Sequence, residues 1–325
     1  MALPFEALSN TVLLAAKATR IALDRSKKIA RLQKADHTTV TAADLASQVI
    51  LLSSVAEFAP DEKVLAEESP QALSNPAFAE EVRELVEEVQ RRSVSKGEVY
   101  DAIAYRGNPA GENTWFVDPI DGTRGYLVGL HYAVAVARVA EGQLENSWLA
   151  VPKKDNGALS GASGHLFTAT RNRGAFRKPI NGGDWEKLPA RHHPPDDRLA
   201  VVASRAHDAV KLPHSVNRKK WGVELLSMDS QAKYAALAIG RADIYPRKPN
   251  RWFGPFFCWD HAAGVLLVTE TGGVATDLAG MEFDWSQGER LLGNRGIFAA
   301  SSWERYHAFQ PQFAAHATNL LKGNR

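Results

Sequence analysis

Cysteine is almost absent from this 325-residue chain, and its scarcity excludes several kinds of site. Cys258 is the only cysteine, so an intrachain disulfide and a thiolate metal cluster are impossible, and we expect no disulfide partner. A single thiol is typical of a reducing compartment, so we expect a cytoplasmic protein. No apolar run reaches the roughly 18 residues that span a bilayer, and we therefore expect no membrane partner.

Strong net charge and the common nucleotide-binding motifs are missing as well. The formal net charge is +2, which is too small to indicate nucleic acid as a partner. The sequence contains no P-loop, no Gly-x-Gly-x-x-Gly fingerprint and no Gly-x-Ser-x-Gly nucleophile elbow. Any anion-binding site must therefore come from local geometry.

The first half of the chain changes from helices to strands. Helical periodicity covers residues 5–32, 41–58 and 78–92, with a short strand at 63–66. From residue 114, apolar segments separated by turn residues predict an antiparallel sheet with helices packed on it. The predicted strands are 114–117, 132–140, 143–151, 165–170 and 174–177.

A polar, proline-rich segment at residues 190–198 is the best candidate for a linker. Beyond it strand and helix alternate, which predicts an α/β layer. The predicted strands are 199–204, 222–226 and 242–245, and the predicted helices are 207–213, 230–239 and 260–271. We therefore expect two domains, an α+β domain over residues 1–190 and an α/β domain over residues 195–325.

The most informative stretch covers residues 115–123, Trp-Phe-Val-Asp-Pro-Ile-Asp-Gly-Thr. It is typical of a buried strand that ends in two carboxylates, Asp118 and Asp121. Carboxylates seldom end a core strand unless something compensates their charge. A hard cation does so, because Mg²⁺ prefers carboxylate and carbonyl oxygens and leaves positions for phosphate. The stretch therefore predicts half of a metal site.

Other acids at the ends of elements are candidates for the second half of this site. Glu67 follows a predicted strand, and two strand-end acid clusters converge if their strands are neighbours. Asp260 opens a predicted helix, where it is either an N-cap or a metal ligand. Asp44 follows Thr41 by three residues at another helix start, and this spacing by itself favours a capping box.

Gly122 and Thr123 indicate a different chemistry. The glycine allows the backbone to approach an anion, and amides at a helix start donate to phosphate oxygens. The threonine hydroxyl is placed to orient a water molecule. The alternative is a plain turn, because Asp-Gly is a common turn dipeptide. The spacing leaves both interpretations open.

Three motifs in this set resemble those of the inositol monophosphatase superfamily of Mg²⁺-dependent, lithium-sensitive phosphatases. The motifs are Glu67-Glu68-Ser69, Asp118-Pro119-Ile120-Asp121-Gly122-Thr123 and Trp259-Asp260-His261-Ala262-Ala263-Gly264. Residues 40–44, 229–234 and 242–245 are similar to those of the 3′(2′),5′-bisphosphate nucleotidase branch. The resemblance implies a layered α-β-α-β-α sandwich of the sugar-phosphatase type, of mixed α+β and α/β class. Its N-terminal half would contain an antiparallel sheet and its C-terminal half a mixed sheet.

The resemblance also implies a role for each matched residue. The implied metal ligands, for two or three Mg²⁺ ions, are Glu67, Asp118, the carbonyl of Ile120, Asp121 and Asp260. Asp44 would accept a hydrogen bond from the Thr123 hydroxyl, which then orients the attacking water, and this role outweighs the capping box. The amides of Gly122 and Thr123 would bind the departing phosphate. Ser230 and Lys233 would contact the rest of the substrate.

The implied activity is removal of the 3′- or 2′-phosphate from a nucleotide such as adenosine 3′,5′-bisphosphate. The alternative is a phosphatase of another small substrate, either an inositol phosphate or a modified nucleotide. It stays open because the chain has Phe256-Phe257-Cys258 where these nucleotidases have a Glu-Lys-aliphatic triplet. The two phenylalanines are either core residues or a stacking surface for a base. A non-catalytic nucleotide-binding protein is a third alternative, and the complete set of acids argues against it.

Overall fold

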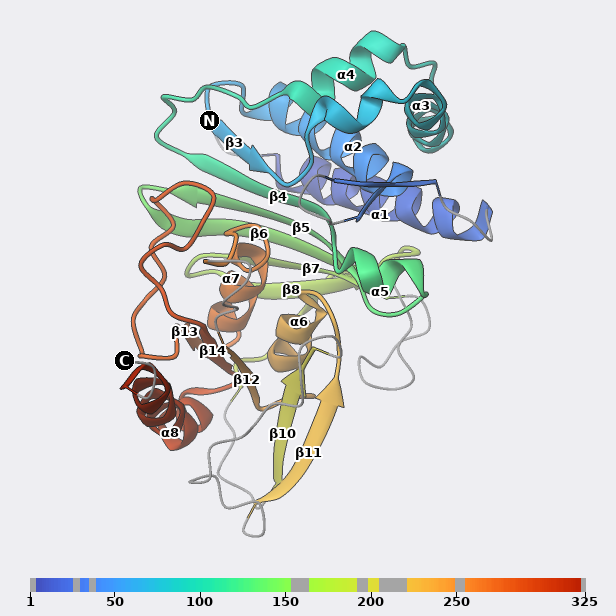
Figure 1. Cartoon of the computed structure of the whole chain (residues 1–325). Coiled ribbons are helices and arrows are strands. Elements are labelled where there is room, and N and C mark those ends of the chain that lie inside the picture. The colour runs from blue at the N-terminus through green and yellow to red at the C-terminus, as the bar shows by residue number, and fades with distance from the viewer. Residues whose placement is uncertain are drawn as a thin grey trace.

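The computed structural model describes residues 4–25, 30–34, 39–152, 164–191, 198–204, 221–248 and 255–322. The predicted helix 207–213 and most of the predicted linker 190–198 lie outside the described residues. Five layers follow one another in Figure 1: helices, a large sheet, helices, a smaller sheet and a final helix. The expected α-β-α-β-α sandwich is therefore confirmed.

The first layer consists of helices on the outer face of the large sheet (Figure 1). They are α1 (Phe5–Arg25), α2 (Ala42–Phe58), α3 (Pro76–Gln90) and α4 (Lys96–Ala104), with a 3₁₀ turn, η1 (Pro70–Ser74), before α3. Helix α2 is buried along most of its length, because it packs between the sheet and the other helices of this layer. It therefore holds side chains close to the strands beneath it.

The structure of this layer differs from the sequence-based predictions in two places. The prediction that helix continues to residue 32 is wrong, since α1 ends at Arg25 and the strand β1 (Arg31–Gln33) pairs with β2 (Thr39–Thr41). Helix α4 was not predicted, because only Val99 and Ile103 of its residues are buried and its apolar stripe is correspondingly short.

Apart from β1 and β2, which form a pair of their own, the described strands of the N-terminal half form a seven-stranded sheet in the order β3-β4-β5-β6-β7-β8-β9. Its members are β3 (Lys63–Ala66), β4 (Thr114–Asp121), β5 (Ala133–Ala140), β6 (Gln143–Val151), β7 (His165–Thr170), β8 (Gly174–Pro179) and β9 (Glu186–Lys187). Neighbours from β4 to β9 are antiparallel, as expected, whereas β3 is parallel to β4. The parallel pair brings the ends of β3 and β4 to the same edge.

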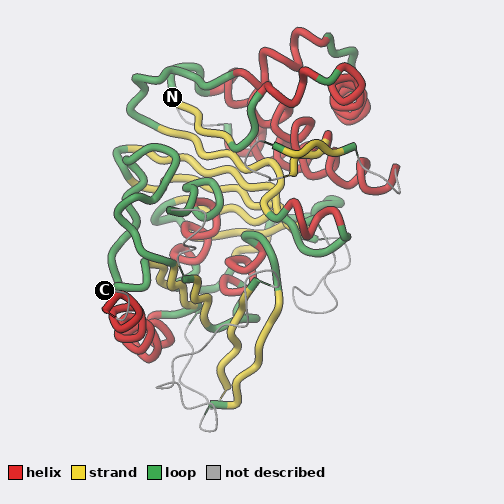
Figure 2. Tube along the Cα trace, viewed as in Figure 1, coloured by secondary structure: helices red, strands yellow, loops and turns green. Residues whose placement is uncertain are grey.

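Helices α6 (Ala232–Ala238) and α7 (Ala262–Glu270) lie between the two sheets, as Figure 2 shows. Residues 262–268 are all buried, because α7 contacts strands of both sheets. The smaller sheet mixes parallel and antiparallel pairs in the order β11-β10-β12-β14-β13. Its members are β10 (Arg198–Ala203), β11 (Gly222–Ser227), β12 (Ile244–Arg247), β13 (Val274–Thr276) and β14 (Ile297–Ala300), and α8 (Trp303–Lys322) covers its other face.

One hydrophobic cluster spans both halves of the chain. Phe116 and Leu149 of the large sheet belong to the same buried cluster as Leu266 of α7 and Trp285. The division into domains at residues 190–195 stays a prediction, since most of that boundary lies outside the described residues. Among the described helices, none combines the length and the apolar character that a bilayer-spanning segment needs.

Candidate metal centre and active site

The carboxylates of β4 lie on one face because the strand contains a bulge. In a regular strand, side chains three residues apart point to opposite faces of the sheet. Here the pairing register advances three residues on β4, from Asp118 to Asp121, but only two on β5. The extra residue turns Asp121 onto the face of Asp118. Pro119 is tolerated between them, because prolines within sheets occur at bulges.

Glu67 lies beside Asp118 as a result of the parallel pairing of β3 with β4. Its amide donates to the Val117 carbonyl at 3.1 Å, and its side chain is close enough to that of Asp118 for its charge to add to the rise that burial causes in the pKa of Asp118. The buried Gln48 of α2 fixes the next residue, because its Nε2 donates to the Glu68 carbonyl at 2.8 Å and its Oε1 accepts from the Glu68 amide at 2.9 Å. The two strand-end acid clusters therefore lie together.

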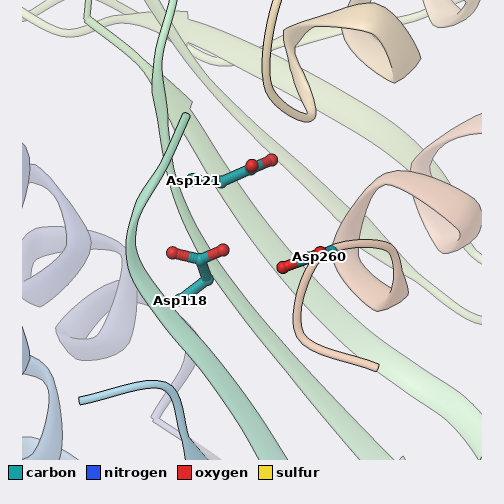
Figure 3. Close-up of side chains that lie close together, drawn as sticks. All are labelled: Asp118, Asp121 and Asp260. Carbon is teal, nitrogen blue, oxygen red and sulfur yellow. The ribbon is translucent and has the colours of Figure 1, made fainter. Parts of the chain in front are cut away.

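Asp260 reaches the same point from the C-terminal half of the chain. It lies in the turn before α7, and the N-cap position of that helix belongs to His261. One ligand oxygen from each of Asp118, Asp121 and Asp260 lies within 4.8 Å of the others. Figure 3 shows the three carboxylates gathered in one space between β4 and the turn before α7. Such a cluster of oxygens is the donor set that a hard divalent cation requires.

Burial and mutual repulsion raise the pKa of these carboxyl groups. Burial is the larger cause, and neighbouring carboxylates add to it, so the pKa of Asp260 rises to about 7. The same two causes hold the pKa of Glu67 and of Asp118 well above the usual range. Burial also raises the pKa of Asp121, where the charge of Lys233 opposes the rise. Carboxyl groups perturbed in this way are typical of functional sites.

A divalent cation fits this donor set. Asp118 is 1% exposed, and its Oδ1 has no hydrogen-bond partner in the part of the chain that the structure describes. A buried carboxylate oxygen without a partner destabilises the folded state. A cation among the carboxylates would satisfy that oxygen and offset their repulsion. Oxygen donors without histidine or cysteine suit Mg²⁺ better than softer transition metals.

Asp44 contacts both the start of α2 and Thr123. Its Oδ2 accepts from the amide of Thr41 at 2.8 Å, and its own amide donates to the Thr41 hydroxyl oxygen at 3.3 Å, which completes a capping box. Its Oδ1 accepts from the Thr123 hydroxyl at 3.3 Å. That hydroxyl has a second acceptor, the Ile120 carbonyl, at 3.1 Å. The capping box and the contact with Thr123 therefore coexist. Burial raises the pKa of Asp44 to about 6.

Gly122 brings the end of β4 against the turn before α6. Its φ of +88° lies in the left-handed region, which glycine adopts without strain. A Cβ at this position would lie 3.0 Å from the Cβ of Ser230. Helix α5 (Thr123–Leu127) begins directly after Gly122. Ser230 therefore lies next to the Gly-Thr turn, although the two come from opposite halves of the chain.

Lys233 places a buried ammonium group near the carboxylates. It is 5% exposed, and its Nζ lies 5.3 Å from the centre of the Tyr245 ring. Its charge opposes the rise that burial causes in the pKa of Asp121 and of Asp260. It makes no salt bridge within the described ranges. A buried cation of this kind favours an anionic ligand.

Arg247 is a cation of the site that the motifs did not indicate. It ends β12, and its guanidinium lies 4.5 Å from the centre of the Phe256 ring. Its Nη1 lies 3.5 Å from Nε2 of His261, which must accept because an arginine only donates. Its charge also opposes the rise that burial causes in the pKa of Asp260. The sequence feature that could have indicated Arg247 is its position as a basic residue two residues after the predicted strand 242–245.

Phe256 and Phe257, which lie where the nucleotidases have a Glu-Lys pair, both pack against other side chains. Phe257 stacks on Trp259 with 4.5 Å between ring centres, and the Arg290 guanidinium lies 3.7 Å from the Phe257 centre. At these distances the two neighbours must occupy opposite faces, so Phe257 has no free face for a base. Phe256 packs edge-on against His261 at 5.1 Å and supports the guanidinium at the end of β12.

The chain is similar in sequence to a known protein family and to individual proteins with related names. Residues 6–319 match the inositol monophosphatase family. The chain is 33% identical over 294 residues to a 3′(2′),5′-bisphosphate nucleotidase of Schizosaccharomyces pombe, covering 83% of this chain and 82% of that protein. It is 34% identical over 296 residues to a protein of the same name from Oryza sativa, covering 82% of each.

Solved structures share the fold at lower identity. The extragenic suppressor protein suhB from Bartonella henselae has a TM-score of 0.63 and 18% identity, covering 95% of this chain and 97% of that one. CysQ from Bacteroides thetaiotaomicron, a bacterial member of the inositol monophosphatase family, has a TM-score of 0.57 and 21% identity, covering 90% and 96%. These similarities concern the fold.

The layered fold, the acid cluster and the curated relatives together define a phosphatase. The chain belongs to the inositol monophosphatase family, as its motifs predicted. Members of that family generally depend on Mg²⁺. The expected family, fold class and enzyme class are thus confirmed, while the roles of individual residues stay predictions.

Proposed function

We propose that this phosphatase is Mg²⁺-dependent and removes the 3′- or 2′-phosphate from a nucleotide such as adenosine 3′,5′-bisphosphate. The observation that carries the proposal is the convergence of Asp118, Asp121 and Asp260 near the buried ammonium of Lys233. The carboxylates suit a cation and the ammonium suits an anion, which together favour a substrate with two phosphates. The curated relatives are named 3′(2′),5′-bisphosphate nucleotidases, which supports this substrate.

The metal site in this proposal holds two or three Mg²⁺ ions. Its ligands are Glu67, Asp118, the Ile120 carbonyl, Asp121 and Asp260. When bound, Mg²⁺ supplies Lewis-acid stabilisation of the phosphoryl oxygens and lowers the pKa of water. The chain contributes the fixed placement of these oxygens, through the bulge in β4 and the parallel pairing of β3 with β4.

Thr123 and Asp44 orient the attacking water in this proposal. The Thr123 hydroxyl donates to Asp44 Oδ1, so the lone pairs of the hydroxyl are available to accept a hydrogen bond from water. The water forms a bond to phosphorus as the bond from phosphorus to the ribose oxygen breaks. Positioning and electrostatics, rather than covalent chemistry by the protein, account for most of the rate in phosphoryl transfer.

The two phosphates of the substrate are assigned to different segments. The amides of Gly122 and Thr123 bind the phosphate that is removed, as expected for a left-handed glycine followed by a helix start. Ser230, Lys233 and Arg247 contact the remaining part, including its second phosphate. Lysine supplies a point charge and arginine a fork suited to two phosphate oxygens.

Release of inorganic phosphate from three substrates tests this proposal. We expect Mg²⁺-dependent release from adenosine 3′,5′-bisphosphate, at a kcat/KM above those for inositol 1-phosphate and adenosine 5′-monophosphate, and no release after chelation. An Asp118→Asn preparation controls for contaminating phosphatases. Preference for inositol 1-phosphate would favour the other small substrate. Binding without Mg²⁺-dependent release from any of the three would indicate a non-catalytic nucleotide-binding protein.

A further inference from the structure

Gln231 connects the two sides of the carboxylate cluster. It lies in the turn before α6 and is 1% exposed. Its backbone amide donates to Oδ2 of Asp121 at 2.5 Å. Its side-chain Nε2 donates to the Trp259 carbonyl at 2.9 Å, and its Oε1 accepts from the Gly264 amide at 2.9 Å. One buried residue therefore bonds to Asp121 and to the backbone on both sides of Asp260.

These hydrogen bonds leave the side-chain amide of Gln231 one orientation. Rotating it by 180° would face its NH₂ group toward the Gly264 amide and its oxygen toward the Trp259 carbonyl, so both bonds would be lost. The surrounding helices add to this rigidity. A Cβ on Gly264 would lie 2.2 Å from the Tyr234 ring, so α6 and α7 approach this closely only because residue 264 is glycine.

The backbone amide of Gln231 also orients the Asp121 carboxylate. Because Oδ2 accepts a hydrogen bond from this amide, it keeps one lone pair for a cation, whereas Oδ1 keeps both. The side-chain bond to the Trp259 carbonyl places the following residue, Asp260, relative to the same turn. Both carboxylates are thus positioned by one residue that is not itself a metal ligand.

We propose that Gln231 is a positioning residue that sets the separation of the Asp121 and Asp260 carboxylates and thereby the affinity of the site for Mg²⁺. The inference rests on the proposed metal site and extends it. Without the side-chain amide, the segment around Asp260 loses two hydrogen bonds to the turn before α6. Residues that orient metal ligands typically change metal affinity or activity by about 10–100-fold when they are replaced.

Calorimetric titration of Mg²⁺ into the metal-free protein tests this role without relying on activity. Gln231→Leu has a similar size, removes both side-chain hydrogen bonds and keeps the backbone amide that bonds to Asp121. We expect Mg²⁺ binding to weaken roughly 10–100-fold. Gln231→Met should give the same weakening, and its unbranched side chain adapts to the space if leucine prevents folding.

Gln310→Leu is the matched control. Gln310 is also a buried glutamine, 8% exposed, and its Nε2 donates to the Leu278 carbonyl at 3.1 Å. This bond lies beside α8, next to the cluster on the outer face of the smaller sheet. The control variant should unfold at a lower temperature and yet bind Mg²⁺ with wild-type affinity.

Three results decide whether Gln231 positions the metal ligands or only stabilises the fold. Weaker Mg²⁺ binding in the Gln231 variants, together with wild-type affinity in the control, supports the proposal. Wild-type Mg²⁺ affinity in the Gln231 variants, with only a lower unfolding temperature, would overturn it and leave a purely structural role. If the wild-type protein itself does not bind Mg²⁺, the proposed metal site is wrong.

Discussion

The two halves of the chain bring different charges to the candidate site. In the N-terminal half, Glu67, Asp118 and Asp121 lie at the ends of two paired strands and bring negative charge. A cation on that side, Lys34, lies 3.9 Å from Glu67 but forms its closer salt bridge with the neighbouring Glu68, at 2.6 Å. In the C-terminal half, Asp260 comes from a turn, Lys233 adds a buried positive charge and Arg247 a half-buried one. The difference is consistent with separate roles for the two halves in our proposal. Acids on paired strands suit metal binding, and cations on the opposite side suit recognition of a second phosphate.

Replacing an acid of the N-terminal half should have the largest effect. Asp118→Asn should lower kcat by about 10³-fold or more, because a metal contributes several kcal/mol of transition-state stabilisation and 1.36 kcal/mol corresponds to a factor of ten. The variant loses one of several mutually repelling buried charges, so without metal it should unfold at a higher temperature than the wild type. Turnover at saturating Mg²⁺ and melting curves in chelator measure both effects. Near wild-type turnover would contradict the metal assignment.

Removing the Thr123 hydroxyl should have the next largest effect. Thr123→Val keeps the shape of the side chain but cannot donate to Asp44, so kcat should fall about 10²-fold while KM changes little. Thr123→Ser keeps the hydroxyl and is the matched control, which should retain most of the activity. Steady-state kinetics on both variants decide the matter. Equal activity in the valine and serine variants would remove the hydroxyl from the mechanism.

The stability of the metal-free protein should depend on pH in a direction set by the acid cluster. Because the folded-state pKa of Asp260 is raised to about 7 and those of Glu67 and Asp118 are raised well above their usual range, the neutral forms stabilise the fold below about pH 4. The part that Asp260 contributes should be lost as the pH rises through about 7, when that carboxyl group ionises. Mg²⁺ at about 100 times its Kd should restore about 2.7 kcal/mol.

Melting curves between pH 4 and pH 8, in chelator and in Mg²⁺, measure this dependence. The Asp118→Asn variant should show a shallower loss of metal-free stability with rising pH, since it has one fewer group to ionise. Metal-free stability that rises steadily with pH over this range would mean that the acids do not repel one another in the folded protein.

The smallest expected effect concerns Cys258, two residues before Asp260. Burial raises the pKa of its thiol to about 12, and its Sγ lies 3.4 Å from the Gly288 carbonyl, so it should react with thiol reagents only when the turn opens. Mg²⁺ at ten times its Kd should slow this reaction about tenfold if the open turn does not bind metal. Labelling rates with and without Mg²⁺ test this. Equal rates would mean that opening of the turn does not depend on metal binding.

The N-terminal part of the site could be predicted from the sequence because its acids lie at the ends of apolar segments that form strands. Glu67 and Asp118 were expected to converge if their strands were neighbours, and β3 and β4 are neighbours. The bulge in β4 was not predictable, because it depends on the register with β5, and a register is a property of two segments. The same limit explains the error at residues 31–33, where pairing with β2 overrides helical periodicity.

The C-terminal part was harder to predict because its geometry depends on turns and on contacts between distant segments. Ser230 has a φ of +65°, which is uncommon for a residue other than glycine. Residue spacing does not predict this conformation. Arg247 and Gln231 are assigned to the site only by their contacts with the turn before α7 and with the N-terminal acids. The family resemblance supplied Ser230 and Lys233, but not these two residues.

The division between the two halves is tested most directly by two substrates that differ only in the 5′-phosphate, adenosine 3′,5′-bisphosphate and adenosine 3′-monophosphate. We expect the wild type to prefer the bisphosphate, through a lower KM. Lys233→Met should raise that KM by about 10–100-fold, the effect of losing a charged hydrogen bond, and leave hydrolysis of the monophosphate nearly unchanged. An equal loss with both substrates, or an undiminished preference for the bisphosphate, would contradict the assignment of the second phosphate to the C-terminal half.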